Sequence, residues 1–594
     1  MIRHFPARHR VSPAPSEFEA PHRLRSLVRS RETALVVLGA VAGAIAGLVV
    51  TAMNAAVDGL HALLFGIPAG TRLSASWSVD PVAAVAVPCL GGLAFGIVSA
   101  WLAARRPQRE IDPIEANALH GGRMSLLGSL VVAVKTVWSS GVGASVGLEA
   151  GYTQLAAGIA SRLGIAFRLR RGDLRVLVGC GAAGGIAGAF QAPLAGAFYA
   201  FELVIGTYSV AGLAPVAAAA VVGYAVAGAL SPGHLGIIAV PSGTVAHHDL
   251  LLAALLGLAM AGLGIGVMRS VAVVEALFVR FVKPALRPFL GGFLVGCLAL
   301  ITPRVLSSGH GALHLVGLLD LSLKTVASIL ALKIVASVVS LGAGFRGGLF
   351  FASLLMGALA GQIFAVAIVT VAPGLHVDSN IWSVVAMSAL AATVVGGPLT
   401  MTFIALESTG DLWLTVAVLV AVIVAAQVTR ETFGYSFATW RFHLRGETIR
   451  SAADVGWMRD LTVGRMMREA RTVPADTTIG ALRRAFPLGS TGQVVAVEPD
   501  DVYAGLVAVP EAHAAEHDAA APVRSLLRFP EEMLSRTMTA KQAAAVFDRT
   551  EAEALAVVES EETRKVVGLL TEAYLLRRYS AELERRRQEI IGDG

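Results

Sequence analysis

The sequence predicts an all-α polytopic membrane protein that is followed by a smaller soluble α/β region. Of the 594 residues, 55% are hydrophobic and 15% are charged, and the mean hydropathy is +0.68. These values are typical of a membrane protein and argue against an ordinary soluble enzyme. Acidic residues divide the chain, because residues 33–445 hold 15 of them and residues 446–594 hold 24. We therefore expect the first region in a bilayer and the second in water.

The N-terminal segment, residues 1–32, is basic and rich in arginine and proline. The apolar run after it is too long for a cleavable signal peptide. Arginines that precede a first membrane helix favour a cytoplasmic N-terminus. We therefore expect an integral multi-pass membrane protein with cytoplasmic termini, in the inner membrane if the source is bacterial. The net charge of +6 indicates topology in the bilayer rather than binding to nucleic acid.

Apolar runs of very different lengths fill the first region. They lie at about 33–65, 82–104, 125–138, 174–206, 211–232, 249–279, 288–303, 325–342, 347–373, 381–407 and 413–429. Some are shorter than the roughly 20 residues that span a bilayer, and others are long enough to cross it at a steep tilt. Runs of mixed length, interrupted by Gly and Pro, predict broken helices that end inside the protein.

An internal repeat supports this architecture. Residues 193–202 read PLAGAFYAFE and residues 398–407 read PLTMTFIALE, so that Pro, Leu, Phe, Ala and Glu recur at the same offsets. Weak internal repeats combined with interrupted helices are typical of transporters whose site lies where the repeats meet.

A glycine-rich stretch at 139–163 carries one acid, Glu149, just before a helix predicted to start at 150–159. A carboxylate among apolar and small residues is costly unless it is paired, hydrogen-bonded or neutralised. The N–H groups and dipole of a helix N-terminus attract anions, so a tethered carboxylate there can compete with a mobile anion for the same donors. The alternative is an acid that simply caps a helix at a tight turn.

The soluble region contains two similar units, 459–520 and 521–585, after a linker at 446–458 and before a charged tail at 586–594. Each unit is expected to hold a short opening motif, a helix and two strands. The helices are predicted at 478–486 and 539–549, and the strands at 493–498, 502–509, 554–559 and 566–571. The strand predictions depend on period-two patterning and β-branched residues.

Together these residues resemble the CLC family of chloride channels and proton-coupled chloride transporters, over roughly 35–445. Residues 147–151, Gly-Leu-Glu-Ala-Gly, resemble the family's G-K/R-E-G-P loop, and residues 348–352 resemble its G-x-F-x-P loop. Gly434-Tyr435-Ser436 resembles the helix that offers a tyrosine hydroxyl to the anion. The C-terminal region resembles a pair of CBS domains, which many CLC proteins carry.

The resemblance implies a CLC-type inverted repeat of tilted and broken helices with a cytoplasmic α/β CBS pair. It also implies a homodimer in which each subunit has one anion pathway. Glu149 would be the gate, and the N–H groups of Leu349 and Phe350 would bind the anion without a full positive charge. Tyr435 would donate its O–H group, although a lone tyrosine is also typical of a membrane-interface anchor.

Two departures from the family pattern affect these expectations. The first anion loop should fall at 108–112, but its serine is absent there. Either Arg109 or a backbone group such as that of Ile111 substitutes for it, or the loop is rearranged. Leu203 stands where coupled transporters carry a proton-relaying glutamate, and leucine cannot hold a proton. Glu202 could serve instead, or it could be a structural acid that Glu407 matches in the second half.

No cofactor is expected. In CBS pairs that bind nucleotides, a Thr or Ser is usually followed two residues later by an aspartate, whereas here Thr571 precedes Glu572 and Ala573. Adenine nucleotide binding is therefore not supported. The three cysteines are far apart in apolar segments, which is typical of packing rather than of a metal site.

The leading function is transport of chloride or a similar small anion through a glutamate-gated, channel-like pathway with weak or variant proton coupling. One alternative is a proton-coupled chloride antiporter, and another is a transporter of fluoride or nitrate. From a different class, the chain could be a membrane sensor with CBS output and a degenerate pore. The sequence shows no nucleophile–base or metal cluster that would indicate an enzyme.

Overall fold

The computed structural model describes residues 32–578, apart from 69, 106–109, 232–244, 247–248, 317–320, 374–376, 435, 438 and 441–460. The predicted N-terminal basic segment up to residue 31, the linker at 446–458 and the charged tail at 586–594 lie outside these residues. The chain divides into two compact units, Met1–Asp454 and Val455–Gly594, and each is described by itself.

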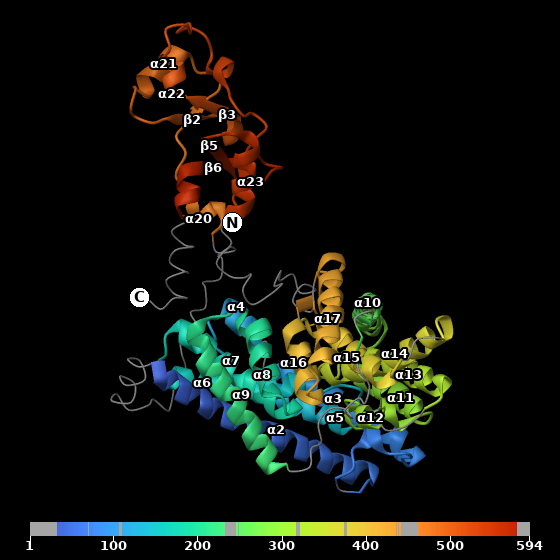
Figure 1. The fold of residues 1–594 in the computed structure, drawn as a ribbon. Coiled ribbons are helices and arrows are strands. Elements are labelled where there is room, and N and C mark those ends of the chain that lie inside the picture. The colour runs from blue at the N-terminus through green and yellow to red at the C-terminus, as the bar shows by residue number, and fades with distance from the viewer. Residues whose placement is uncertain are drawn as a thin grey trace. The chain divides into compact units, whose positions relative to one another are not determined.

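Helices make up the named secondary-structure elements in the described residues of the first unit (Figure 1). Its first half contains α2 (Glu32–Phe65), α3 (Pro81–Arg105), α4 (Pro113–Leu119), α5 (Leu126–Gly141), α6 (Glu149–Ala166), α7 (Arg171–Phe190), α8 (Pro193–Tyr199) with its π-helical extension η2 (Ala200–Ile205), and α9 (Val210–Leu230). Its second half contains α10 (Asp249–Phe281), α11 (Arg287–Ala299), α12 (His310–Val316), α13 (Leu323–Gly342), α14 (Phe350–Val371), α15 (Ser379–Val395), α16 (Pro398–Thr409) and α17 (Leu412–Thr432).

Within the described residues, eight of these helices are long and apolar enough to cross a membrane. Others are much shorter, such as α4 and α12 with seven residues each. This mixture confirms the prediction of an all-α membrane protein built from spanning and broken helices.

Two apolar runs that are continuous in the sequence each form two helices. The run at 174–206 breaks at Gln191, whose φ of 53° ends α7, and Pro193 then starts α8. The run at 381–407 breaks at Gly396, whose φ of 89° ends α15, and Pro398 starts α16. A residue in the left-handed conformation ends one helix, and proline favours the first turn of the next. The same chemistry therefore produces the same break in both halves.

The two halves repeat the same packing. Helix α2 packs against α7 and α9 in the first half, as α10 packs against α15 and α17 in the second (Figure 1). Helices α3 and α11 cross where Gly92 meets the carbonyl of Pro288 and Gly292 meets the carbonyl of Pro88. A Cβ at either glycine would overlap the facing carbonyl oxygen, so glycine permits this close crossing. The internal repeat in the sequence is therefore a repeat of the fold.

The second unit holds two three-stranded sheets. The first has the order β1-β2-β3, formed by Thr472–Pro474, Gln493–Glu498 and Val502–Ala508, and the second has the order β4-β5-β6, formed by Leu534–Ser535, Ala554–Val558 and Val566–Thr571. In each sheet the first pair is parallel and the second is antiparallel. The accompanying helices are α21 (Ile479–Ala485) and α23 (Ala540–Thr550).

The expected helices and long strands of both units are present, in the arrangement predicted for a CBS pair. The short strands β1 and β4 were not predicted, because three and two residues are too few to show an alternating pattern. Buried side chains from both sheets, including Val495, Leu506, Leu555 and Val557, share one core, so the two halves pack as one body.

If the first unit holds the anion pathway that the resemblance implies, we predict that the C-terminal unit regulates transport rather than forming the pathway. A chain truncated after about residue 450 should remain folded, because the first unit has its own core. We expect a single symmetric peak in size-exclusion chromatography and anion flux within a few-fold of the full chain. Complete loss of flux from a well-folded truncated protein would contradict the prediction.

Candidate functional site

The site is built on two loops that meet across the repeat. Gly147, just before α6, and Gly348, just before α14, form an isolated antiparallel bridge. Gly147 N donates to Gly348 O at 2.9 Å, and Gly348 N donates to Gly147 O at 3.2 Å. This reciprocal pair holds the N-termini of α6 and α14 beside each other. Two helix N-termini at one place concentrate N–H groups and partial positive charge.

The carboxylate of Glu149 lies at this junction. Glu149 is the first residue of α6, only 4% of it is exposed, and its Oε1 accepts a hydrogen bond of 2.7 Å from Phe351 N in the first turn of α14. Its other oxygen, Oε2, is buried and has no hydrogen-bond partner among the described residues. The acid of one half therefore occupies a helix N-terminus of the other half.

The N–H group that binds the carboxylate follows directly after the two residues predicted to bind the anion. Leu349 and Phe350 were predicted as the anion-binding donors, and Phe351 is the residue whose N–H the carboxylate engages. Because α14 begins at Phe350, all three N–H groups belong to the start of the helix and lack carbonyl partners one turn earlier. The assignment of Leu349 and Phe350 as anion ligands stays a prediction.

Aromatic rings enclose this junction. Phe190, at the end of α7, stacks on Phe351 and lies against Phe350, with ring centroids 4.4 Å apart in both pairs. His310, the first residue of α12, packs on the Phe351 ring at 4.5 Å. These rings pack on the first turn of α14, and the buried surroundings strengthen the hydrogen bond from Phe351 to the carboxylate.

We expect Gly147 to be essential for the position of the Glu149 carboxylate at Phe351 N. A Cβ at residue 147 would overlap both carboxylate oxygens of Glu149. Gly147→Ala should therefore expel the carboxylate and raise anion flux at neutral pH by several-fold, measured as chloride efflux from liposomes. Gly59→Ala in α2 is the matched control, because a Cβ there meets nothing within 4 Å. An unchanged flux in Gly147→Ala would contradict this prediction.

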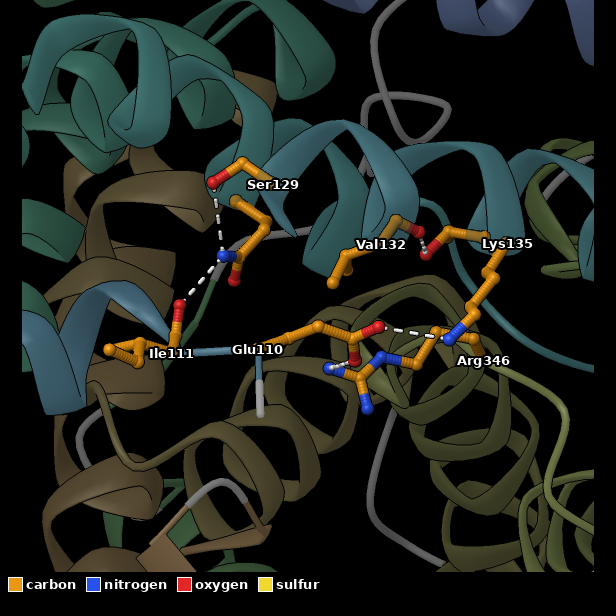
Figure 2. Close-up of polar contacts among 8 residues, drawn as sticks. Glu110, Ile111, Ser129, Val132, Lys135 and Arg346 are labelled. Carbon is orange, nitrogen blue, oxygen red and sulfur yellow. Dashed lines mark hydrogen bonds and ion pairs between the residues drawn. The ribbon is translucent and has the colours of Figure 1, made fainter. Parts of the chain in front are cut away.

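The loop at 108–112, where the serine of the family's first anion loop would lie, is only partly described. Arg109 and, in the second half, Tyr435 lie outside the described residues. Ile111 uses its carbonyl, which accepts a hydrogen bond of 2.8 Å from Gln154 Nε2 on α6 (Figure 2). A carbonyl so engaged fixes the loop against α6, and whether the Ile111 backbone binds an anion stays a prediction.

Glu110, beside Ile111, joins this loop to two cations. Its Oε1 accepts a hydrogen bond of 2.9 Å from Lys135 Nζ on α5, and its Oε2 lies 3.8 Å from Arg346 Nη2 in the loop before α14 (Figure 2). The backbone N–H of Arg346 in turn donates to Ser139 Oγ on α5 at 3.0 Å. The Glu110–Lys135–Arg346 cluster thus connects three segments that surround the site.

A small polar cavity adjoins the two site loops on another side. It has a volume of about 30 Å³, enough for a water molecule or two, and Leu148 and Phe351 are among its lining residues. Its polar lining includes Asp58, His61 and Arg72. The cavity therefore reaches Phe351 and the residue that precedes Glu149.

Glu202 and Glu407 cap helices across the repeat. Glu202 accepts hydrogen bonds from Leu399 N at 2.8 Å and from Thr400 N at 2.9 Å, at the start of α16. Glu407 accepts from the N–H groups of residues 194 and 195 at the start of α8, at 2.8 and 3.0 Å. This reciprocity favours the structural role that the sequence left open for Glu202, while a relay role for it stays a prediction.

Comparison with known proteins places this site in a family. The family profile described as voltage gated chloride channel matches residues 91–430, which is more than half of the chain. The chain belongs to this family. The match covers Glu149, the loop before α14 and both repeated PL…E segments.

Similar CLC proteins include the "Voltage-gated ClC-type chloride channel ClcB" of Citrobacter koseri, with 28% identity over 403 residues, 66% of this chain and 95% of that protein. The ClcB of an Escherichia coli strain matches to the same extent. Solved structures share the fold. A slow cyanobacterial Cl⁻/H⁺ antiporter aligns with a TM-score of 0.60 at 21% identity, covering 69% of this chain and 97% of that one.

Two more solved structures extend this fold comparison. A eukaryotic CLC transporter aligns with a TM-score of 0.60 at 19% identity and covers 92% of this chain and 98% of its own. A CLC-type fluoride/proton antiporter aligns with a TM-score of 0.54 at 22% identity and covers 67% and 96%. The predicted CLC-type fold is confirmed.

Sequence reasoning missed several polar residues of this CLC chain. Lys135 and Lys333 each interrupt an apolar run, and that exception was the available signal. Lys333 is fully buried, and its Nζ donates to the carbonyls of Val305 and Ser307 at 3.2 and 2.8 Å, which anchors the loop before α12. Phe351 carried no sequence signal, because every residue except proline supplies a backbone N–H. Across the described residues, no group of three His, Cys, Asp or Glu side chains could hold a metal ion.

Proposed function

We propose that this CLC chain carries chloride or a similar small monovalent anion across a membrane, along a pathway that the Glu149 carboxylate closes. The observation that carries the proposal is the hydrogen bond from Phe351 N to Glu149 Oε1 at 2.7 Å. A carboxylate held by the N–H groups of a helix N-terminus stands in for a mobile anion of the same charge.

Opening requires that the carboxylate leave and an anion take its place. Protonation removes the charge of Glu149 and so weakens its bond to Phe351, and an anion can then bind the exposed N–H groups. The second carboxylate oxygen, buried without a described partner, makes the closed state costly. The pathway is expected to open more often as the pH falls.

Reconstitution in liposomes tests this function. Vesicles that contain the protein are loaded with potassium chloride and placed in a chloride-poor medium. They should release chloride when valinomycin carries out potassium and so balances the charge, and vesicles without protein should not. Absence of anion flux from folded, reconstituted protein would reject the proposal and favour a membrane sensor with a degenerate pore. The same assay with fluoride or nitrate determines anion selectivity.

We further propose that the chain forms a homodimer with one pathway per subunit and with both termini in the cytoplasm. The CLC fold and the arginines ahead of α2 support this arrangement. The function is transport rather than catalysis of a chemical reaction, and the C-terminal unit is proposed to regulate it without a bound nucleotide.

A further inference from the structure

The Glu110–Lys135–Arg346 cluster is an ionic group inside a membrane domain. Lys135 is the one charged residue of the 16-residue helix α5, and Arg346 stands in the loop that leads into α14. The side chains of Glu110, Lys135 and Arg346 are 24%, 22% and 27% exposed. Charged groups that are exposed within a membrane domain face water, because contact with lipid would cost several kcal/mol. We therefore expect this surface to face water rather than lipid.

The cluster lies close to the anion site along two separate segments. Ile111, next to Glu110, is fixed to Gln154, which is five residues after Glu149 on the same helix. At 1.5 Å per residue this places Gln154 about 7.5 Å along the axis of α6 from the gate. On the other side, Arg346 precedes Leu349 by three residues, in the loop whose Gly348 bridges to Gly147. An anion that passes between the loops is within reach of this charge.

The three side chains together carry one excess positive charge, since two cations share one carboxylate. Both oxygens of Glu110 are used, one by Lys135 and one by Arg346. The carboxylate therefore lies where a small anion would bind if Glu110 were neutral.

We propose that Glu110 is a second tethered anion, which competes with mobile chloride for Lys135 and Arg346 and so sets the chloride affinity of this side of the pathway. The inference deepens the proposed transport function and rests on it. It differs from the gate at Glu149, because the competing donors here are full charges on side chains and not backbone N–H groups. Salt screens such a partly exposed site, so its effect is largest at low ionic strength.

Chloride titration calorimetry of the purified full-length protein, at low ionic strength in isethionate buffer, tests the inference. Glu110→Gln frees both cations and should tighten chloride binding by about threefold to tenfold, as expected for one unit charge removed at several ångströms in a partly hydrated site. Lys135→Met should weaken binding by a similar factor. The double variant of Glu110→Gln with Lys135→Met restores the single excess positive charge of the wild type. Its chloride affinity should lie within about twofold of the wild-type value.

A merely structural cluster would behave differently. Breaking the Glu110–Lys135 bond would then lower thermal stability in both single variants and in the double variant, without opposite shifts in chloride affinity. Glu532→Gln, which neutralises an acid in an exposed pair with Arg549 in the C-terminal unit, is the control and should leave binding unchanged. Chloride binding by Glu110→Gln that equals or falls below the wild type, in protein of normal stability, would overturn the inference.

Flux measurements separate this inference from the proposed function. If the wild type carries chloride, Glu110→Gln should reach half-maximal flux at a lower chloride concentration. If the wild type carries no anion, the transport proposal fails, and calorimetry still decides whether Glu110 competes with chloride. Failure to detect chloride binding in Glu110→Gln itself would count against the inference.

Discussion

Glu149→Gln is expected to abolish the pH dependence of anion flux and to raise flux at pH 7.5 about tenfold. Glutamine keeps the size of the side chain but removes its charge, as protonation does. A charge-assisted hydrogen bond contributes about 1.5–3 kcal/mol and a neutral one about 1 kcal/mol, so the closed state loses on the order of 1 kcal/mol or more. The bond at stake is the one from Phe351 N.

The sign of the pH effect follows from the carboxylate. In the wild type, low pH protonates Glu149 and opens the pathway, so flux should rise as the pH falls. Glu149→Gln should be open at every pH. Glu149→Asp, which keeps a titratable group, is the control and should retain a pH-dependent flux. Chloride efflux from liposomes between pH 4.5 and 8 measures all three proteins, and a wild-type pH profile in Glu149→Gln would exclude this gate.

A chloride gradient across liposomes is expected to drive little uphill proton movement through this chain. Leu203 is buried beside Glu202, and hydrocarbon cannot receive and release a proton. The Glu202 carboxylate is held by two backbone N–H groups and by Thr400 Oγ1 at 2.6 Å, all at the start of α16. These bonds fix the carboxylate in place at the start of α16, whereas a proton carrier needs neighbouring groups that can pass a proton on. Parallel chloride and pH electrodes measure both fluxes.

Glu407 provides a matched control for the role of Glu202. If both acids cap helices, Glu202→Gln and Glu407→Gln should each lower the free energy of unfolding by about 1–2 kcal/mol. The two variants should then show the same proton flux as each other. Leu203→Glu would place a carboxylate where coupled relatives are expected to carry one, and should increase proton movement. Strong uphill pumping by the wild type that only Glu202→Gln abolishes would refute the channel-like mechanism and identify Glu202 as the relay.

Much of the fold could be predicted from the sequence, because it depends on local and additive properties. Apolar composition placed residues 33–445 in a membrane, and period-two patterning located the long strands of the soluble unit. The matching PL…E segments predicted a repeated fold, which the reciprocal packing of α3 against α11 shows directly. The breaks at Gln191 and Gly396 were harder to locate, since each interrupts a run that stays apolar on both sides.

The site was predicted less completely, because its chemistry depends on pairs that are far apart in the chain. The sequence indicated Glu149 as the unusual acid and the loop before α14 as a source of donors, but the tertiary structure selected Phe351 as its partner, 202 residues away. It also brought Glu110 next to Lys135 and Arg346. No regular spacing in the sequence relates these three residues.

The sequence by itself thus determined the membrane location, the repeat, the soluble pair of units and the one acid at a glycine-rich helix start. The tertiary structure decided which charges meet. It turned Glu202 and Glu407 towards helix N-termini of the opposite half, and it set the Glu149 carboxylate against α14 instead of leaving it as a cap of its own helix. The physical reason is that hydrophobicity and helix-breaking chemistry act along the chain, whereas a buried charge is stabilised only by donors that folding brings to it.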